Sequence, residues 1–428
     1  MSEEKNVPRL RFPGYTEPWE QRKVSDLAEK TYGGGTPTTS NEAYWNGDIP
    51  WIQSSDVVDG KLLGVEPRKW ITQDGLNNSA AQLIPGNSIA IITRVGVGKL
   101  AFMPYSYATS QDFLSLSKLN EEPLFTVYAC YKKLQSELNA VQGTSIKGIT
   151  KDELLAKNIM VPRYAEQQQI GAFFKQLDNL ITLHQRKLEH VKDLKKSMLQ
   201  KMFPKNGQSY PEVRFPGFTD AWEQRKLGDI INEYKETVDS DCTLPILTSS
   251  KTEGVILQEE HFGRKQQHDI TGYNILPRNY CTYRNRSDGV DFTFNINKCC
   301  DKGIISKFYP VFSGKNSDVF FLSLVLNNSE EVIREIAYTC TGTGQKVLSF
   351  LDLQKMKVRV PNFDEQKEIA AYFESLDHLI TRHQRQPPIH IRFDHLSIIF
   401  NNNYTTSSTC NTIFMKGVLT YANHHYQK

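Results

Sequence analysis

Residues 7–27 read VPRLRFPGYTEPWEQRKVSDL, and residues 210–230 read YPEVRFPGFTDAWEQRKLGDI. Twelve of these 21 positions are identical, and the second copy starts 203 residues (210 − 7) after the first. A period this long excludes a solenoid, whose units run about 20–50 residues. The spacing therefore predicts that a whole domain has been duplicated.

A second block repeats at the other end of each copy. Residues 141–187, VQGTSIKGITKDELLAKNIMVPRYAEQQQIGAFFKQLDNLITLHQRK, match residues 340–386, CTGTGQKVLSFLDLQKMKVRVPNFDEQKEIAAYFESLDHLITRHQRQ, at 19 of 47 positions. The segments between the blocks, 28–140 and 231–339, show no comparable similarity. Constant ends and divergent middles favour a shared role in assembly and separate roles in recognition. The alternative is an old duplication in which only structural residues stayed alike.

Length and composition restrict the class of protein. A chain of 428 residues with 39% hydrophobic residues is long enough for two or three domains with real cores. The net charge is only +3, from 51 basic and 48 acidic residues, so any basic surface must be local. The apolar runs are too short to span a membrane, and no signal peptide is readable at the start. Seven scattered cysteines without a C-x-x-C motif indicate free thiols, so we expect a cytoplasmic protein with no membrane partner.

The second block predicts a short strand followed by a long helix in each copy. Proline ends the strands expected at 158–161 and 357–360, and Glu166 and Glu365 then favour the first turn of a helix. Apolar residues recur at three- and four-residue spacing through 165–203, which predicts a helix on the order of 55 Å long. Its apolar stripe must be buried, and the matching helix after Pro361 offers a stripe of its own. We expect the two helices to form an antiparallel, coiled-coil-like pair related by a pseudo-twofold repeat.

The divergent middles predict an α+β (mixed α/β) fold. Short β-type runs are punctuated by Gly, Pro, Asn and Ser, and helical stretches follow them. The helical stretches are 124–139 and 329–338. The expected strands are 49–53, 88–93, 100–103, 279–283, 303–309 and 319–326.

No catalytic motif is readable. The chain has no G-x-x-x-x-G-K-[ST] loop, no H-E-x-x-H, no metal-spaced Cys/His cluster and no G-x-S-x-G. Gly33-Gly34-Gly35 precedes Thr-Pro-Thr-Thr and predicts a turn. His184 and His383 occupy equivalent helix positions, where packing is the better interpretation than catalysis.

What remains is a pattern suited to DNA contact. Arg reads guanine, Gln and Asn read adenine, and Lys or Thr holds phosphate. Each residue alone is better interpreted as part of a solvated loop. The candidates are Thr36, Gln53, Arg94, Lys99, Gln111, Lys147, Arg284, Asn285, Arg286, Gln345 and Lys346.

Over about residues 7–386 the chain resembles the specificity subunit of Type I restriction-modification systems. The resemblance is carried by the duplicated RFPGxxxxWEQRKxxD, by GGTP…YWNGDIPW…D at 34–56, and by the VP…EQ…LD…ITxHQR helices. It implies that each middle is a target recognition domain for half of a bipartite double-stranded DNA site. It also implies that the helices dock the modification subunits. The residues that would do so are Leu177, Ile181, His184, Leu188, Val191, Leu376, Ile380 and His383.

The same resemblance implies that the chain is not catalytic. Modification subunits would bind S-adenosylmethionine and methylate adenine N6, and restriction subunits would use ATP and Mg²⁺ to translocate and cleave DNA. Two other interpretations stay open. One is a duplicated adaptor that binds no DNA, and the other is a fused methylase-specificity enzyme, which the lack of an N-P-P-[FY] motif disfavours.

The resemblance also gives a domain plan. We expect a first recognition domain at 7–160, a spacer helix at 161–206, a second recognition domain at 207–360 and a second helix at 361–386. Pro387-Pro388 forbids further helix, and the remaining sequence resembles the product of a shifted reading frame. We therefore expect a truncated second helix, a poorly ordered tail at 387–428 and weakened assembly. The Ile170–His184 end of the long helix should lack its full partner and expose an apolar strip.

Overall fold

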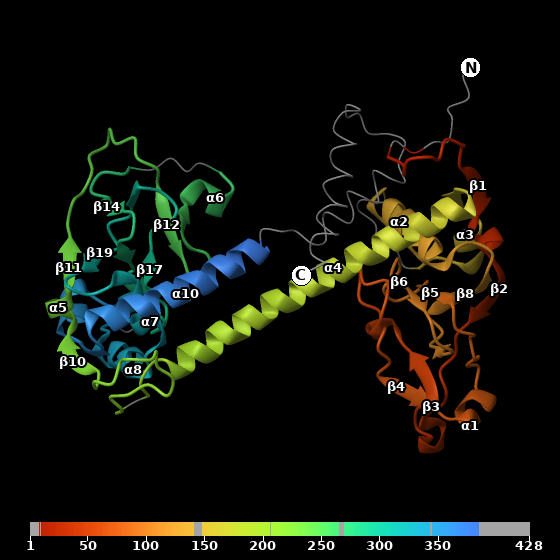
Figure 1. Cartoon of the computed structure of the whole chain (residues 1–428), viewed down its shortest axis with the longest axis horizontal. Helices are drawn as coiled ribbons and strands as arrows, with labels where there is room; N and C mark the ends of the chain where they lie inside the picture. Colours follow the sequence, from red (N-terminus) through yellow and green to blue (C-terminus); the bar gives the residue numbers. More distant parts are fainter. Residues whose placement is uncertain are drawn as a thin grey trace. The chain divides into compact units, whose positions relative to one another are not determined.

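The computed structural model describes residue 8 and residues 10–140, 148–205, 207–264, 269–342 and 345–384; for 139 and 140 it describes only the backbone. The chain splits into two compact units, the first ending at His184 (unit 1) and the second beginning at Gln185 (unit 2). The boundary lies inside helix α4 (Tyr164–Lys201), drawn in yellow and green in Figure 1. The long helix predicted at 165–203 is therefore confirmed. The tail expected at 387–428 lies outside the described residues.

Unit 1 is built on a four-stranded sheet of order β2-β8-β5-β6 and a three-stranded sheet of order β4-β3-β7. Its strands are β1 (Glu20–Lys23), β2 (Ala28–Gly33), β3 (Trp45–Ile52), β4 (Lys69–Ile71), β5 (Ser88–Ile92), β6 (Leu100–Met103), β7 (Ala108–Thr109), β8 (Phe113–Leu119) and β9 (Asn158–Val161). Its helices are α1 (Gln73–Asn77), α2 (Pro123–Ala140), α3 (Lys151–Leu155) and the first half of α4.

Strand β5 divides the core of unit 1 because successive side chains of a strand point to opposite faces. Ile89 and Ile91 pack in the cluster that contains the α2 residues Phe125 and Tyr128. Ala90 and Ile92 pack in a second cluster on the other face of the sheet. Burial on both faces explains why β5 is an uninterrupted apolar run.

Unit 2 is built on a four-stranded sheet of order β11-β19-β15-β17, with further two-stranded pairs. Its strands are β10 (Glu223–Lys226), β11 (Ile231–Tyr234), β12 (Leu247–Ser250), β13 (Gly254–Leu257), β14 (Asn274–Pro277), β15 (Cys281–Thr282), β16 (Arg286–Ser287), β17 (Asn295–Ile296), β18 (Lys302–Ile305), β19 (Val311–Gly314), β20 (Lys346–Val347) and β21 (Lys357–Val360). Its helices are α5 (Leu227–Ile230), α6 (Gln258–Phe262), α7 (Val319–Asn328), α8 (Glu330–Thr339), α9 (Phe350–Lys355) and α10 (Phe363–Gln384). Both units mix helices and strands, which confirms the predicted mixed α/β class.

The strand predicted at 319–326 is wrong, because this segment is helix α7. Asp318 caps the helix by accepting a hydrogen bond from the backbone N–H of Phe321 at 2.8 Å. The helix carries six consecutive buried residues, Phe321–Leu326. An apolar run that is buried all round has no periodicity that separates a helix from a strand.

The EQRK residues of each WEQRK motif form one strand of a two-stranded antiparallel sheet. Strand β1 pairs with β9, and strand β10 pairs with β21. Strands β9 and β21 coincide with the predicted 158–161 and 357–360. The tryptophan just before each of these strands is buried. Trp19 packs against Phe125 of α2, and Trp222 packs against Phe321 of α7.

The arginine of each RFPG motif binds a buried glutamate at the start of a long helix. Arg11 donates from Nε and Nη2 to the two carboxylate oxygens of Glu166, both at 2.7 Å. Arg214 does the same to Glu365, at 2.7 and 2.6 Å. The bidentate bond adds a strong, geometrically specific partner to the helix dipole that the sequence indicated. The repeated RFPG and E-Q strings are thus two ends of one structural contact.

The glutamine after each glutamate fixes the start of another helix. Gln167 accepts the backbone N–H of Glu122, just before α2, and donates to the carbonyl of Pro162. Gln366 accepts the Ser317 hydroxyl at 2.6 Å, just before α7. Each E-Q pair therefore connects its long helix to the RFPG segment and to the start of a second helix in the same unit, which is α2 in unit 1 and α7 in unit 2.

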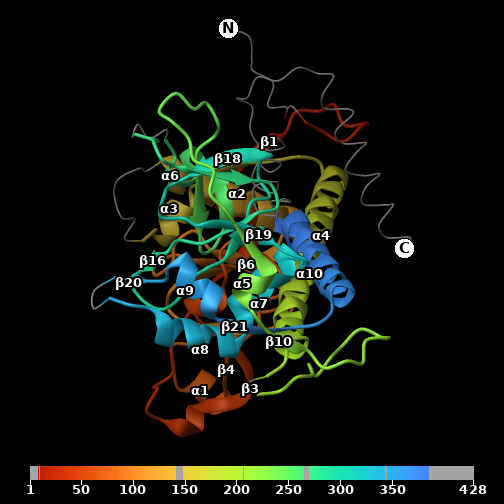
Figure 2. The same cartoon turned by 90° about the vertical axis from the view of Figure 1, so that its left-hand side faces the viewer.

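Within unit 2, helix α10 lies beside the second half of α4 (Figures 1 and 2). Lys195 donates to Asp377 at 2.5 Å, and the Phe203 ring lies 6.1 Å from the Phe373 ring. The α4 residues Val191, Leu194, Met198 and Leu199 pack on the core cluster that contains Phe373 and Leu376.

The expected exposed strip at Ile170–His184 is largely absent. Ile170, Phe173, Phe174 and Leu177 are buried in the core of unit 1. Ile369, Phe373 and Leu376 are buried in the same way in unit 2. The first turns of α4 and α10 therefore bury their apolar stripes in the cores of their own units and not against each other.

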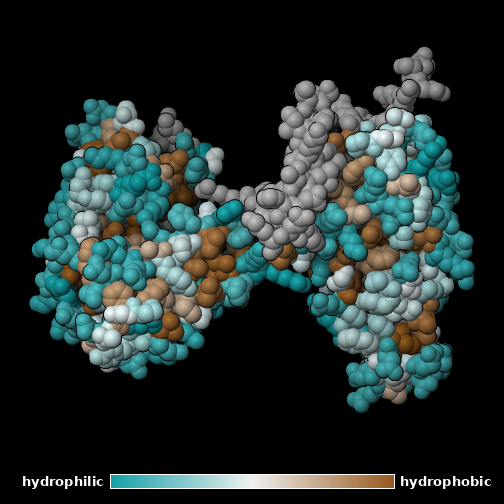
Figure 3. Space-filling model, viewed as in Figure 1, coloured by the Kyte–Doolittle hydropathy of each residue, from teal (hydrophilic) through white to brown (hydrophobic). Residues whose placement is uncertain are grey.

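On the face shown in Figure 3, the described surface of both units is mainly hydrophilic, with hydrophobic patches between the hydrophilic residues. Among the described residues, no helix is both long and apolar enough to span a membrane. Nor does the described part of the chain hold a group of three His, Cys, Asp or Glu residues placed to bind a metal ion.

Candidate nucleic-acid interface

In unit 1, Thr36 and Gln111 lie side by side although 75 residues separate them in the sequence. The Thr36 hydroxyl donates to the amide oxygen of Gln111 at 2.6 Å, and both side chains are exposed. The segment before Thr36 is fixed by the Gly35 N–H, which donates to the Thr109 carbonyl at 2.8 Å. A Cβ atom on Gly34 would lie 1.8 Å from the Ser110 carbonyl oxygen. The glycine run thus permits close approach of two loops, which the sequence had predicted only as a turn.

The stretch around Gln111, between β7 and β8, also contacts the neighbours of two other candidates. Gln53 follows Ile52, whose carbonyl accepts the Ser110 N–H at 2.9 Å. Arg94 follows a threonine whose N–H and hydroxyl both donate to the Asp112 carbonyl. Thr36, Gln53, Arg94 and Gln111 therefore all adjoin the short stretch between β7 and β8.

The loop from Arg94 to Lys99 joins β5 to β6. Gly98 has φ of +92°, and its carbonyl accepts the Gln135 side-chain N–H of α2 at 3.2 Å. The positive φ would strain any other residue, and a Cβ would also lie 2.2 Å from Cδ1 of Leu138, so glycine is favoured here. Arg94 is exposed and Lys99 half-buried. The candidate Lys147 lies outside the described residues.

In unit 2, the candidates from two distant segments meet in one strand pair. Strand β16 pairs with β20, which places Arg286 opposite Val347 and Ser287 opposite Lys346. Arg284 is exposed and lies two residues before β16 begins. The Gln345 amide donates to Asp288 at 3.4 Å, and the Lys346 ammonium donates to the Gly342 carbonyl at 2.9 Å. The pairing brings all five candidates of unit 2 together.

Asn285 is held more tightly than its neighbours. Its backbone N–H donates to the Phe308 carbonyl at 2.9 Å, and its carbonyl accepts the Leu348 N–H at 3.0 Å. Its amide oxygen is buried and has no hydrogen-bond partner among the described residues. In this conformation the oxygen of Asn285 is not presented to a ligand, whereas Arg284 and Arg286 on either side are exposed.

Acidic groups near β16 already have partners. Asp291 binds Lys251 and accepts the Ser287 hydroxyl at 3.1 Å. The bond from Lys251, followed by that from Ser287, lowers the pKa of Asp291 below its usual value. Asp291 is therefore a stable carboxylate that belongs to the loop itself.

Sequence reasoning missed the contacts of Lys69 and Arg286 with aromatic rings. The Lys69 ammonium lies 5.6 and 5.9 Å from the rings of Trp45 and Trp51. The Arg286 guanidinium lies 4.5 Å from the centre of the Phe308 ring. The sequence showed aromatic residues among basic ones, but which pairs form depends on the tertiary structure.

The residues expected to dock modification subunits differ in exposure. Leu177 and Leu376 are only 9% and 4% exposed, because each packs in the core of its own unit. They are therefore removed from a free docking face. Val191 packs partly on the core of unit 2. The remaining candidates, which are half-buried, are Ile181, His184, Leu188, Ile380 and His383.

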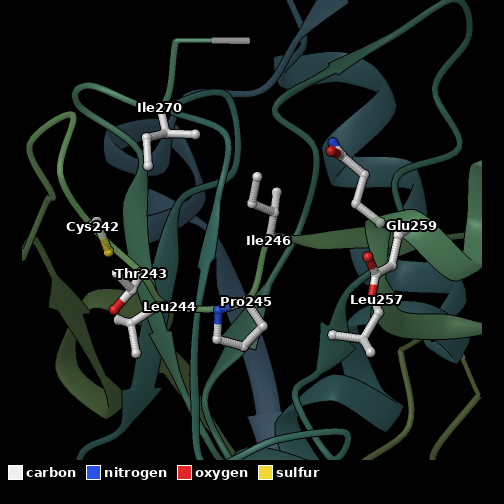
Figure 4. Close-up of a pocket in the computed structure, with 9 residues that line it drawn as sticks. Cys242, Thr243, Leu244, Pro245, Ile246, Leu257, Glu259 and Ile270 are labelled. Carbon is white, nitrogen blue, oxygen red and sulfur yellow. The ribbon is translucent and has the colours of Figure 1, made fainter. Parts of the chain in front are cut away.

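Unit 2 also contains a pocket of about 420 Å³, lined by the segment before β12, the end of β13, the start of α6 and Ile270 (Figure 4). Leu244, Pro245, Ile246, Leu257 and Ile270 give it a mainly apolar lining. Cys242 and Glu259 face it from opposite sides (Figure 4), so the pocket does not bring acid–base groups together.

Comparison with known proteins gives one consistent family. The model of the Type I restriction modification DNA specificity domain matches the chain twice, at residues 16–193 and 219–389. The chain is 25% identical over 228 residues to the Type I restriction enzyme MjaIX specificity subunit of Methanocaldococcus jannaschii, covering 50% of the chain and 51% of that protein. It is 31% identical over 184 residues to the EcoR124I/EcoR124II specificity subunit of Escherichia coli, covering 39% and 45%. The chain thus matches about half the length of these two relatives.

Other similarities extend over nearly the whole chain. The MjaVIII specificity subunit of Methanocaldococcus jannaschii is 22% identical over 402 residues, covering 88% of the chain and 89% of that protein. The crystal structure of a Type I restriction-modification system S subunit from M. genitalium has a similar fold, with a TM-score of 0.58 at 15% identity. That alignment covers 93% of the chain and 100% of the solved one.

Proposed function

The chain belongs to the Type I restriction-modification DNA specificity family, and from this we propose that it is the subunit of such a complex that recognises DNA. The single observation that carries the proposal is that the family model matches the chain twice, once for each copy of the repeat. Each recognition domain, 7–160 or 207–360, would then read one half of a bipartite double-stranded DNA site.

The candidate DNA face of unit 1 is the surface around the stretch between β7 and β8. Loops from four parts of the chain meet there, and they carry polar side chains of the types that bind bases and phosphates. The candidate face of unit 2 is the β16–β20 pair, which carries the exposed Arg286, together with the exposed Arg284 two residues before it. The two faces are built from different elements, which supports independent reading of the two halves.

The repeated helices would form the antiparallel pair and dock the modification subunits. The contacts of Lys195 with Asp377 and of Phe203 with Phe373 support an antiparallel pairing, since position rises along α4 as it falls along α10. The half-buried side chains Ile181, His184 and Leu188 would offer the docking face. Where α4 joins the units, residues 161–206 would act as the spacer.

Catalysis would reside in the partners. The curated relatives are specificity subunits of Type I restriction enzymes. We place S-adenosylmethionine and adenine N6 methylation on the modification subunits, and ATP, Mg²⁺ and DNA cleavage on the restriction subunits. The chain itself would supply sequence recognition and assembly.

A domain exchange tests the proposal. Residues 28–140 are replaced by the corresponding segment of a related specificity subunit, and methylated adenines are mapped genome-wide with the modification subunits co-expressed. We expect one half of the methylated sequence to change and the other half to persist. A change in both halves would contradict independent reading. Association with DNA by neither the native nor the exchanged chain would favour the adaptor that binds protein alone.

A further inference from the structure

Phe308 is an exposed aromatic residue placed between two cations. It follows strand β18, and 37% of its surface is accessible to solvent. The Arg286 guanidinium lies 4.5 Å from its ring centre, and the Lys307 ammonium lies 5.9 Å from it. An exposed ring that contacts two positive charges is a preformed binding feature rather than part of the core.

The backbone around Arg286 is fixed on both sides. Asn285, the preceding residue, donates to the carbonyl of Phe308 itself and accepts from Leu348. Arg286 then pairs with Val347 in the β16–β20 ladder. The ring and the guanidinium thus belong to adjacent, hydrogen-bonded segments, so their contact is set by the fold.

The nearby carboxylates bind other residues and not Arg286. Asp288 accepts from Gln345, and Asp291 binds Lys251 and Ser287. Within the described residues Arg286 forms no ion pair. Its charge is therefore available to a ligand.

A guanidinium that stacks on a ring uses its flat face and leaves the N–H donors at its edge free. Two parallel N–H donors match the O6 and N7 acceptors of guanine in the major groove. A lysine ammonium in the same place has no such planar fork. From this geometry we infer that Arg286 reads a guanine in the half-site of unit 2, and that Phe308 is the positioning residue that holds it. The inference rests on the proposed function. It adds to that function the base that Arg286 recognises and the residue, Phe308, that positions Arg286.

The test selects bound sequences from a pool of random DNA duplexes with the full chain, alone and with its modification subunits. The variants are Arg286→Ala, Arg286→Lys, Phe308→Leu and Phe308→Trp. Lys307→Ala is the matched control, because it removes a positive charge beside the Phe308 ring and leaves the paired N–H donors of Arg286 in place. Retained circular dichroism and unfolding midpoint show that each variant is folded.

We expect the native chain to select a guanine at one position of the second half-site. Arg286→Ala and Arg286→Lys should lower that preference about ten- to hundred-fold and leave the other positions unchanged. Phe308→Leu should lower it at the same position, and Phe308→Trp should restore it, since a ring is again present. Lys307→Ala should weaken binding to all sequences alike.

Two outcomes would overturn the inference, and they are distinguishable from failure of the proposed function. If the native chain selects a bipartite sequence and the arginine variants select the same one, Arg286 does not read a base. If Phe308→Leu behaves as the native chain while Arg286→Ala loses the guanine, Phe308 is not the positioning residue. If the native chain selects no sequence in either form, the proposed function fails and the inference fails with it.

Discussion

The two units of the molecule use the same anchor and different surfaces. Arg11 with Glu166 and Arg214 with Glu365 form the same bidentate contact, with distances that agree within 0.1 Å. The candidate recognition faces share no element of that kind: unit 1 uses loops that meet beside β7, and unit 2 uses the β16–β20 pair. The difference teaches that the constant ends of the repeat specify how a domain is held to its helix. The divergent middles are free to change what the domain presents.

The strongest test of the shared anchor removes one glutamate. Glu365→Ala leaves a guanidinium that is 13% exposed without its partner, and breaking such a buried pair costs about 3–5 kcal/mol. Glu166→Ala should cost unit 1 a similar amount, because the geometry is the same. Urea unfolding followed by hydrogen exchange on peptides from each unit would assign the loss.

The matched control is Glu189→Ala, which removes an exposed partner of Lys192. Surface pairs of this kind contribute at most about 1 kcal/mol. The prediction would be contradicted if Glu189→Ala lowered the free energy of unfolding as much as the anchor substitutions do. It would also be contradicted if one anchor substitution destabilised both units.

A second prediction concerns the ring that joins α4 to unit 2. Phe203 contacts Trp222, Phe321 and Phe373, and it is 5% exposed. Phe203→Ala should therefore lower the stability of unit 2 by about 3 kcal/mol. Leu183→Ala, at a site on α4 that is 48% exposed, serves as the comparison and should cost far less. If the two variants had equal midpoints in thermal unfolding, Phe203 would not be an important stabilising contact of unit 2.

A third prediction addresses the recognition face of unit 1. Arg94 is exposed on the β5–β6 loop, and its replacement by alanine should weaken binding to every DNA sequence. The logarithmic dependence of affinity on salt should fall by about one unit, as for the loss of one phosphate contact. Fluorescence anisotropy over a range of salt concentrations measures it. A changed sequence preference at constant affinity would instead assign Arg94 to base reading.

The smallest effect is expected at Thr36. Its hydrogen bond to Gln111 joins two exposed side chains, so Thr36→Val should cost no more than about 1 kcal/mol in stability. Any change in DNA selection should be confined to the half-site of unit 1. Thr38→Val, a nearby exposed threonine, is the control. If the second half-site also changes, the recognition faces are not independent.

Much of the local structure could be predicted from the sequence. Strands β9 and β21 lie at the predicted positions because proline ends each run, and α4 follows a stripe at helical spacing. The failure at 319–326 has a plain physical cause, since burial on every side of α7 erases the period. The candidates of unit 2 were recognised by residue type, but Phe308 was not, because nothing local links it to Arg286.

The duplication, the constant ends, the divergent middles and the long helix can all be read from the amino-acid sequence, because each is encoded in spacing along the chain. Which side chains meet depends on how the chain folds. Arg11 reaches Glu166 across 155 positions, and Arg286 meets Val347 through strand pairing. Such contacts depend on the closure of long loops around a packed core, whose geometry no local pattern carries. The identity of the repeated residues was therefore readable in advance, and their purpose as an anchor was not.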